Sequence, residues 1–424
     1  MLKLSLSNHN FKTEIIAGLT TFLAMSYIIF VNPQILSSAG MNKSALIAAT
    51  CLASGIGTLL VGLFSNTPIA MAPGMGLNAF FAYSLVLGEK IPWETALGIV
   101  FLSGLLFLLL TLAGVRAKLV AAIPKSLVFA ISVGIGIFIT FIGLVNLGLV
   151  VKNDVTLVGM GKFTLTVMIG LIGLLVMVVL EFKKVKGSLL IGVLSSTLLA
   201  WIFGKIGFPS RVLAVNVDLS PIAFKLDILG GLKWGFFGAI FALMFMDLFD
   251  SLGTLVACAH KARITDRGNY TSVINRLLGL DALATMIGAV LGTSTTTAYI
   301  ESGAGIEAGG RTGVTAMVTG ILFFLGLLFV PLIGIVPPYA TAPALIMVGF
   351  FMIKEIVNIN FEATEEAFPS FIIIIMIALT YSISSGLALG FVSFTILMIV
   401  SGKIKEIKPA MWAIALLSVG FFII

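Results

Sequence analysis

The sequence predicts an all-α polytopic membrane protein. Of its 424 residues, 59% are apolar and 10% are charged, whereas an ordinary soluble domain has roughly 45–50% and 25%. The apolar runs at 99–112 and 371–378 lack the period-2 alternation of a membrane β-barrel. Because one helical crossing takes about 20 residues, the chain has room for about 14 crossings and for no soluble catalytic domain.

The apolar segments form two sets separated by a polar link at 211–232. The first set consists of segments 1 to 7, at 15–36, 45–64, 69–87, 96–114, 126–147, 163–180 and 188–203. The second set consists of segments 8 to 14, at 235–259, 277–291, 297–308, 312–330, 340–353, 368–383 and 385–401. The apolar tail at 411–424 is short for a full crossing, so we expect a half-span or a helix lying against the bundle.

Segments 3 and 10 occupy the same position in each set, and both are interrupted. The stretch at 67–78 contains Pro68, Pro73 and Gly74, and the stretch at 293–305 is rich in Thr, Ser and Gly. Since each set has an odd number of segments, the two halves insert with opposite orientations. Paired broken segments in two inverted repeats are typical of a transporter binding site.

The basic residues predict the orientation of the chain. With the N-terminus inside, 17 of the 25 Lys and Arg residues fall on the inner side and eight on the outer side, as the positive-inside rule requires of cytoplasmic loops. Both termini are therefore predicted to be cytoplasmic. The inner residues are Lys3, Lys12, Arg116, Lys118, Lys125, Lys183, Lys184, Lys186, Lys261, Arg263, Arg267, Arg276, Arg311, Lys354, Lys403, Lys405 and Lys408.

Several classes of function have no residues to support them. The net charge of +7 lies in these loops, so we expect no nucleic-acid partner. Cys51 and Cys258 lack metal-ligand spacing, and His9 and His260 lie in polar inner segments. We therefore expect no enzymatic activity, no metal and no cofactor.

Three acidic residues lie inside apolar segments. Asp247 and Asp250 are three residues apart and share one face of segment 8, and Glu301 lies in the broken segment 10. An ionised side chain at the bilayer centre costs at least about 2.5–3.5 kcal/mol, so such acids usually line an ion or substrate path. The alternative is a structural role, with Ser251, Thr254 or the hydroxyls at 293–297 as partners.

An amide and two aromatic residues complete the candidate site. Asn78 follows the break in segment 3, and its side chain is both a donor and an acceptor. Half-helices that start at the two breaks would direct backbone N–H groups toward a polar planar ligand between them. Phe80 and Tyr299 lie close in sequence to these polar groups and would supply a stacking surface.

Four stretches of the chain resemble the azaguanine-type hypoxanthine, adenine and guanine permeases, which belong to the nucleobase-cation symporter 2 (nucleobase-ascorbate transporter) superfamily. They are GLTTFLAMSYIIFVNP at 18–33, APGMGLNAFF at 72–81, DLFDSLGTL at 247–255 and GTSTTTAYIESGAGI at 292–306. The resemblance extends over nearly the whole chain. It implies two inverted repeats of seven segments, with short extended stretches at the breaks in segments 3 and 10.

The resemblance also implies two domains. A core domain would comprise 1–120 and 233–335, and a gate domain 121–210 and 336–424, with 211–232 as the inter-repeat link. The binding and transport residues of the family carry over to Asn78, Asp247, Asp250 and Glu301. The uracil and xanthine branches space their segment-8 carboxylate differently, so the resemblance leaves open which aspartate contacts substrate and which couples protons.

These observations predict a secondary active importer of purine nucleobases in the cytoplasmic membrane. Burial of a carboxylate disfavours its charged form, so we expect Asp250, Asp247 or Glu301 to take up the coupling proton. Sodium is the competing coupling ion, because free carbonyls at a helix break can bind it. An anion carrier of the same fold, a passive channel and an intramembrane hydrolase are the rival functions. The sequence leaves open whether the protein is a homodimer.

Overall fold

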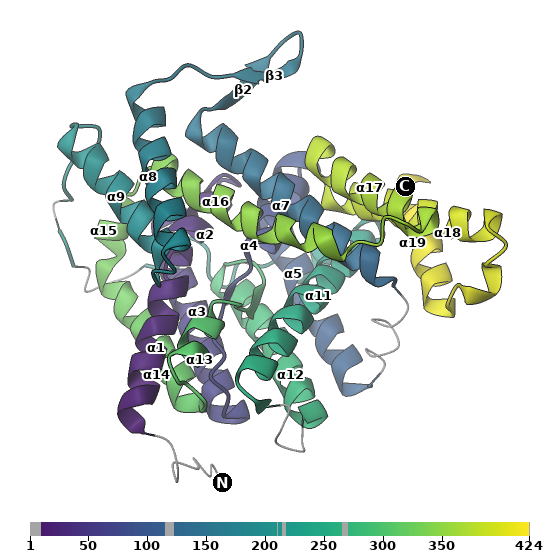
Figure 1. Cartoon of the computed structure of the whole chain (residues 1–424), viewed down its shortest axis with the longest axis horizontal. Helices are drawn as coiled ribbons and strands as arrows, with labels where there is room; N and C mark the ends of the chain where they lie inside the picture. The colour runs from purple at the N-terminus through teal and green to yellow at the C-terminus, as the bar shows by residue number, and fades with distance from the viewer. Residues whose placement is uncertain (1–9, 115–122, 210, 214–217, 265–269, 424) are drawn as a thin grey trace.

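The computed structural model describes residues 10–114, 123–209, 211–213, 218–264 and 270–423, and it is built almost entirely of helices (Figure 1). Among these residues, 10 helices are long and apolar enough to cross a membrane. The predicted class, an all-α polytopic membrane protein, is confirmed. Lys3, His9, Arg116, Lys118 and Arg267, which bear on the predicted orientation and chemistry, lie outside the described residues.

The first half of the chain contains the elements that correspond to segments 1 to 7. They are α1 (Phe11–Met25), α2 (Ile28–Ser37), α3 (Lys43–Ser65), β1 (Met71–Pro73), α4 (Met75–Ala79), η1 (Phe80–Gly88), α5 (Trp93–Leu112), α7 (Lys125–Leu147), β2 (Val150–Asn153), β3 (Leu157–Met160), α8 (Leu165–Phe182) and α9 (Ser188–Ile202). The β2–β3 hairpin projects from one end of the molecule (Figure 1).

The second half begins after the polar link and repeats the pattern. Its elements are α10 (Ile228–Gly231), η2 (Trp234–Phe236), α11 (Phe237–Lys261), α12 (Tyr270–Leu291), β4 (Thr296–Ala298), α13 (Ser302–Glu307), α14 (Gly313–Gly326), η4 (Leu327–Phe329), α15 (Val330–Gly334), α16 (Pro338–Ile353), η5 (Lys354–Asn358), α17 (Thr364–Thr380), α18 (Ile383–Val400), η6 (Ile404–Glu406) and α19 (Pro409–Ile423). The short helix α19 packs against α18 and α11, which fits a tail helix lying against the bundle.

Each predicted segment has a counterpart, and four of them are not among the long spans. Segments 3 and 10 are interrupted by strands, while α9 and α17 have 15 and 17 residues. Segment 3 continues past α4 as the π-helix η1, a form that often marks functional sites.

The two interrupted segments meet in the middle of the fold. β1 pairs with β4 in antiparallel fashion, with Met71 opposite Ala298 and Pro73 opposite Thr296. Further backbone bonds extend the pairing: Tyr299 N donates to the Ala70 carbonyl and Gly74 N to the Thr295 carbonyl, each at 3.0 Å. The predicted extended stretches in segments 3 and 10 are therefore present, and they are joined to one another.

The helices pack as two groups (Figure 1). In the α11 group, α3 packs against α12 and α14, α5 against α11 and α12, and α1 against α13 and α14. In the α7 group, α7 packs against α16 and α17, α8 against α9 and α16, and α18 against α17 and α19. The two groups touch where α1 meets α9, α2 meets α16, α4 meets α7 and α11 meets α18.

Glycines allow very close helix contacts within the α11 group. A Cβ atom on Gly313 of α14 would lie 2.0 Å from the Gly62 carbonyl of α3, and one on Gly305 of α13 would lie 2.5 Å from the Ala17 carbonyl of α1. Small residues let membrane helices approach in this way. The β1–β4 pair itself is contacted by α3, α11 and α12.

Candidate functional site

The site is built on the β1–β4 pair. Thr58 of α3 accepts from Met71 N and donates to the Met71 carbonyl, both at 2.9 Å. On the other strand, Tyr299 reaches across the pair and donates its hydroxyl hydrogen to the Pro73 carbonyl at 2.6 Å. Strands are tolerated at membrane depth only where their backbone groups are satisfied inside the protein, and these bonds satisfy them.

Asn78 lies on α4, five residues after β1, and its side chain is fully buried. Neither its amide nitrogen nor its amide oxygen has a hydrogen-bond partner among the described residues. Buried polar groups in native proteins are nearly always satisfied, and leaving one unpaired costs roughly 1–3 kcal/mol. An amide with both a donor and an acceptor open is what a polar ligand would occupy.

Asp247 of α11 is buried to 1% exposure and is satisfied on one side only. Its Oδ2 accepts from the Thr285 hydroxyl of α12 at 3.0 Å, while its Oδ1 has no partner among the described residues. Thr285 also donates to the Thr296 carbonyl and accepts from Thr296 N. The Thr285 hydroxyl therefore connects Asp247 to β4, while Asp247 Oδ1 is available to a ligand.

Asp281 is a buried acid beyond the three that the sequence singles out. It lies in α12 with 0% exposure. Its Oδ2 accepts from the Ser251 hydroxyl at 2.6 Å, and its Oδ1 accepts from Ala298 N at 3.0 Å. The available signal was its place in the apolar stretch 277–291, four residues before Thr285 and so on the same helical face.

Two of the hydroxyls expected to pair with a buried acid, those of Ser251 and Thr297, lie beside Asp281. Ser251 lies 2.5 Å from the Thr297 hydroxyl while it donates to Asp281. Asp281 therefore fixes α11, α12 and β4 to one another, which is the structural role considered above for Asp247 and Asp250.

Glu301 and Asp250 are the two predicted site acids that are not fully buried. Glu301 immediately precedes α13 and is partly buried, and its Oε1 accepts from the Tyr27 hydroxyl at 2.6 Å. Asp250 is exposed, and its charge interacts with that of Glu301. Gly253, one turn further along α11, has open space beside its Cα. The exposure of Asp250 and the open space beside Gly253 mark an opening on this face of α11.

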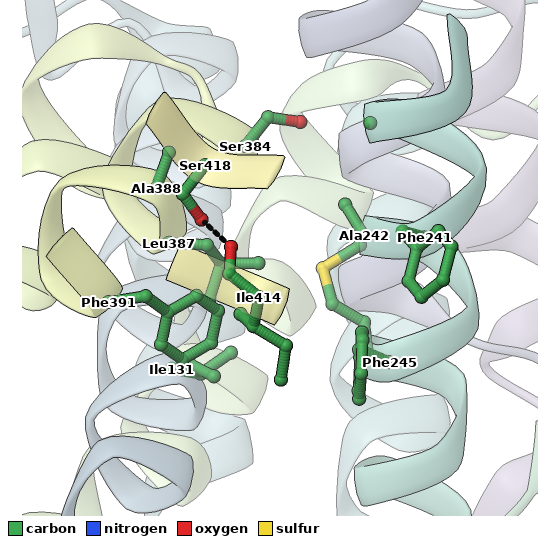
Figure 2. A pocket seen from close by; sticks show the side chains of 12 residues that line it. Ile131, Phe241, Ala242, Phe245, Ser384, Leu387, Ala388, Phe391, Ile414 and Ser418 are labelled. Atoms are coloured by element: carbon green, nitrogen blue, oxygen red, sulfur yellow. Dashed lines mark hydrogen bonds between the residues drawn. The ribbon is translucent and has the colours of Figure 1, made fainter. Parts of the chain in front are cut away.

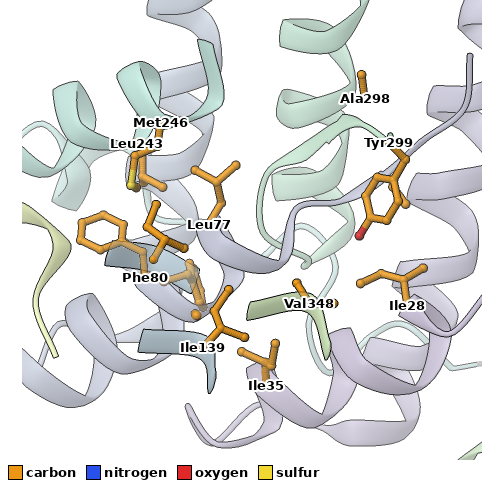
Figure 3. Packing of buried hydrophobic residues seen from close by; sticks show 14 of the residues in the cluster. Ile28, Ile35, Leu77, Phe80, Ile139, Leu243, Met246, Ala298, Tyr299 and Val348 are labelled. Atoms are coloured by element: carbon orange, nitrogen blue, oxygen red, sulfur yellow. The ribbon is translucent and has the colours of Figure 1, made fainter. Parts of the chain in front are cut away.

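The two aromatic residues lie on different sides of the site (Figure 3). Phe80 is fully buried and belongs to the apolar cluster that includes Leu77, Leu243 and Met246. Tyr299 is 5% exposed, and its hydroxyl is engaged by the β1 strand. The structure therefore does not bring Phe80 and Tyr299 together as two faces of one stacking surface.

One cavity of about 70 Å³ lies between α11 and the helices α18 and α19 (Figure 2). Its walls are mainly Phe241 and Phe245 on one side and Leu387 and Phe391 on the other. Ser384 and Ser418 are the two hydroxyl-bearing residues among those that line it. None of the site's acids lines it, so it marks the contact between the two helix groups and not the polar site.

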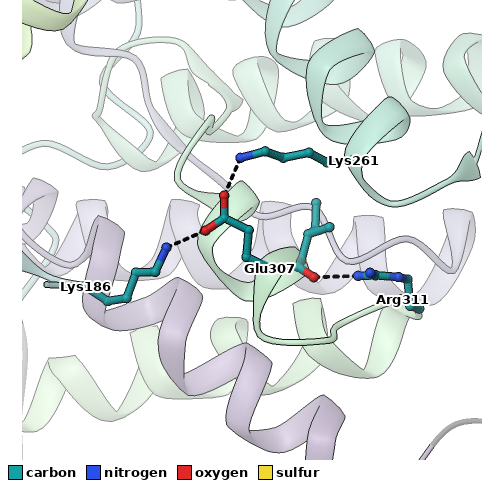
Figure 4. A network of polar contacts seen from close by, with 5 residues as sticks. Lys186, Lys261, Glu307 and Arg311 are labelled. Atoms are coloured by element: carbon teal, nitrogen blue, oxygen red, sulfur yellow. Dashed lines mark hydrogen bonds and ion pairs between the residues drawn. The ribbon is translucent and has the colours of Figure 1, made fainter. Parts of the chain in front are cut away.

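An ion cluster joins the two helix groups at another point (Figure 4). Glu307 at the end of α13 accepts from Lys261 at the end of α11 and from Lys186 in the link between α8 and α9, each at 2.6 Å. All three side chains are about half exposed. The Lys186–Glu307 pair is the part of this cluster that crosses between groups.

Two broken segments that meet at a buried polar site inside a helical membrane fold are typical of membrane transport proteins. The chain belongs to the Permease family (Xan_ur_permease), whose model matches residues 12–389. The family resemblance predicted from four sequence stretches is confirmed, and with it the expectation that the protein is a transporter and not an enzyme.

Three curated relatives match nearly the whole chain. The putative permease MJ0326 of Methanocaldococcus jannaschii is 44% identical over 97% of this chain and 94% of its own. The adenine permease AdeP of Escherichia coli is 40% identical over 96% and 91%. The guanine/hypoxanthine permease PbuG of Bacillus subtilis is 41% identical over 98% and 97%.

Among solved structures, the transmembrane domain of the cyanobacterial bicarbonate transporter BicA has the same fold. The TM-score is 0.68, with 14% identity, 89% of this chain covered and 98% of that domain. At this identity the likeness supports the architecture alone.

Replacing Asp281 is expected to destabilise the protein. In Asp281→Ala, the Ser251 hydroxyl and Ala298 N lose their acceptor inside the protein, at a cost of roughly 1–3 kcal/mol for each unpaired group. We expect a clearly lower melting temperature for the purified protein in detergent, with a smaller loss for Asp281→Asn, which keeps one acceptor oxygen. Asp154→Ala, at a side chain that is 90% exposed, is the control. An unchanged melting temperature in Asp281→Ala would contradict this role.

Proposed function

We propose that the protein is a secondary active importer of purine nucleobases. The observation that carries the proposal is the buried Asn78 amide, which is open on both its donor and its acceptor side within the described part of the chain. Asp247 offers a second open acceptor, and Glu301 a partly buried carboxylate. Relatives at about 40% identity are named adenine permease and guanine/hypoxanthine permease, which supports purines as the substrate class.

The chemistry of a purine fits these groups. A purine presents ring and exocyclic N–H donors, which carboxylates accept, and ring nitrogens or a carbonyl oxygen, which an amide N–H satisfies. The carboxylates of Asp247 and Glu301 are proposed to accept from the purine N–H groups, and the Asn78 amide to donate to a ring nitrogen or carbonyl oxygen. A purine in this position would fill the hydrogen-bonding capacity that Asn78 and Asp247 leave unused. Phe80 is proposed to pack near the ring through its apolar cluster, and Tyr299 to hold the strand pair.

An anion carrier is the strongest rival, because the fold is shared with a bicarbonate transporter. The polar groups of this site argue against it. Asp247, Asp281 and Glu301 receive their hydrogen bonds from Thr, Ser, Tyr and backbone N–H groups within the described chain. A site with several carboxylates and no cation among these partners would repel an anion.

We further propose that the α11 group is the substrate-holding core and the α7 group the gate, as the family resemblance implies. The helices of each group pack mainly among themselves, and the groups meet through few elements. Relative movement of the two groups would break the Lys186–Glu307 ion pair. The apolar cavity beside α18 leaves unfilled space between α11 and the α7 group. Transport would thus proceed by alternating access.

Uptake is expected for adenine, guanine or hypoxanthine. Purified protein in proteoliposomes should accumulate at least one labelled purine, with competition by the unlabelled base. Asn78→Ala removes the open amide and should lower uptake at least about tenfold, because the hydrogen bonds to substrate are lost.

Asn358→Ala is the matched control, because that amide is exposed and bonds only Glu355 among the described residues. Absence of uptake and of binding for all three purines in the unaltered protein would refute the assignment.

Coupling to protons is the second expectation. A carboxylate buried without a cation is costly when charged, so a proton taken up at Asp250, Asp247 or Glu301 lowers the cost of moving the site. Initial uptake should rise as external pH falls from about 8 to about 6. Among Asp250→Asn, Asp247→Asn and Glu301→Gln, the variant at the coupling acid should retain purine exchange and lose uphill accumulation. Accumulation that needs sodium and ignores the proton gradient would assign sodium as the coupling ion instead.

The orientation is also open to a direct test. We propose that both termini and the α8–α9 link face the cytoplasm, because the basic residues concentrate on that side. In a background without Cys51 and Cys258, which are both buried, Lys184→Cys should resist an impermeant thiol reagent added to intact cells. Asp154→Cys in the β2–β3 hairpin is the matched variant and should react. The reverse labelling pattern would overturn the orientation.

A further inference from the structure

Tyr27 makes a contact that the sequence did not single out. It lies in the gap between α1 and α2 with 0% exposure, and its hydroxyl is 2.6 Å from Glu301 Oε1. The two residues are 274 positions apart in the chain. Segment 1 is therefore interrupted as well, and its interruption places a phenol on the acid that precedes α13.

Segment 1 holds the broken segment 10 at two points. Besides the Tyr27 bond, the Asn32 amide nitrogen on α2 donates to the Thr293 hydroxyl at 3.0 Å and to the Thr50 hydroxyl of α3 at 2.8 Å. Thr293 and Glu301 lie on either side of β4. The segment 1 contacts thus bracket the strand, and the Tyr27 contact is the one that ends on a candidate ligand group.

The Tyr27 hydroxyl can hydrogen-bond Glu301 in either protonation state of the acid. Tyr27 is fully buried, and its hydroxyl donates to Glu301 Oε1 at 2.6 Å. A phenol donates to a carboxylate and accepts from a carboxylic acid, so one hydroxyl satisfies Glu301 whether the acid is charged or neutral. A phenylalanine ring would fill the same space and do neither.

We propose that Tyr27 is a positioning residue for Glu301. Its hydroxyl holds one carboxylate oxygen of Glu301 and fixes the direction in which the other oxygen meets an N–H group of the substrate. The inference rests on the proposed function, because it takes Glu301 as a substrate-binding group. It adds a residue of segment 1 to a site otherwise formed by segments 3, 8 and 10.

Binding measurements on matched variants test this role. Tyr27→Phe removes only the hydroxyl, and we expect the Kd for labelled hypoxanthine, adenine or guanine to rise roughly 10- to 100-fold, as for loss of a hydrogen bond to a charged group. Tyr339→Phe is the control, because the buried Tyr339 hydroxyl has no partner among the described residues.

A double-mutant cycle separates positioning from packing. If Tyr27 acts through Glu301, then adding Tyr27→Phe to Glu301→Gln should change the Kd by less than about threefold, because the two side chains form one interacting unit. An unchanged Kd in Tyr27→Phe, or effects of the two substitutions that simply multiply, would overturn the proposal.

An infrared measurement without substrate keeps this inference distinct from the proposed function. The carboxyl band that disappears in Glu301→Gln should be shifted in Tyr27→Phe and unshifted in Tyr339→Phe. Absence of a shift in Tyr27→Phe would show that the hydroxyl does not hold Glu301, and would refute the inference. If the unaltered protein binds no purine, the proposed function fails, and the band shift still decides whether Tyr27 positions Glu301.

Discussion

The antiparallel pairing of β1 with β4 is the constraint on which the rest of the site depends. Two segments from opposite halves of the chain stop being helical at the same place, and each leaves backbone groups that lipid cannot satisfy. Pairing the two strands satisfies many of these groups. The hydroxyls of Thr58 and Tyr299 and the carboxylate of Asp281 satisfy others. Asn78 and Glu301, each close to one end of a strand, are thereby fixed relative to one another.

The buried acids differ in what they bind, and that difference separates structural from ligand-binding roles. Glu14 is fully buried in α1, yet its carboxylate accepts from Arg311 N, Thr312 N and the Thr315 hydroxyl, so it caps the start of α14. Asp281 is likewise bonded through both oxygens. Asp247 keeps one oxygen without a partner in the described chain. Burial alone would have grouped all three together.

The sequence predicts the segments well because hydropathy and helix length are local properties. It also locates both breaks, since Pro73, Gly74 and the run of hydroxyl residues at 293–297 are local features of the sequence. It does not predict that the breaks pair as strands in a particular register, because pairing depends on residues more than 200 positions apart. Asp281 and Tyr27 were overlooked for the same reason: each lies in an ordinary apolar helix or turn, and only its distant partner gives it a role.

The bonds that a movement of one helix group past the other would break indicate which elements move together. The hydrogen bonds that join α2, α3, α11, α12 and the strand pair are buried, and they include those of the Asp281 carboxylate and the Asn32 amide. Between the two sets of helices, the Ser84 hydroxyl of η1 donates to the Tyr381 carbonyl at 2.6 Å, and Lys186 pairs with Glu307. The Lys186–Glu307 pair is half exposed, and exposed ion pairs are worth about 0–1 kcal/mol. The apolar cavity beside α18 reduces the packing between α11 and α18. Opening the strand pair would leave several buried groups unsatisfied, which supports the proposal that the site moves intact with the α11 group.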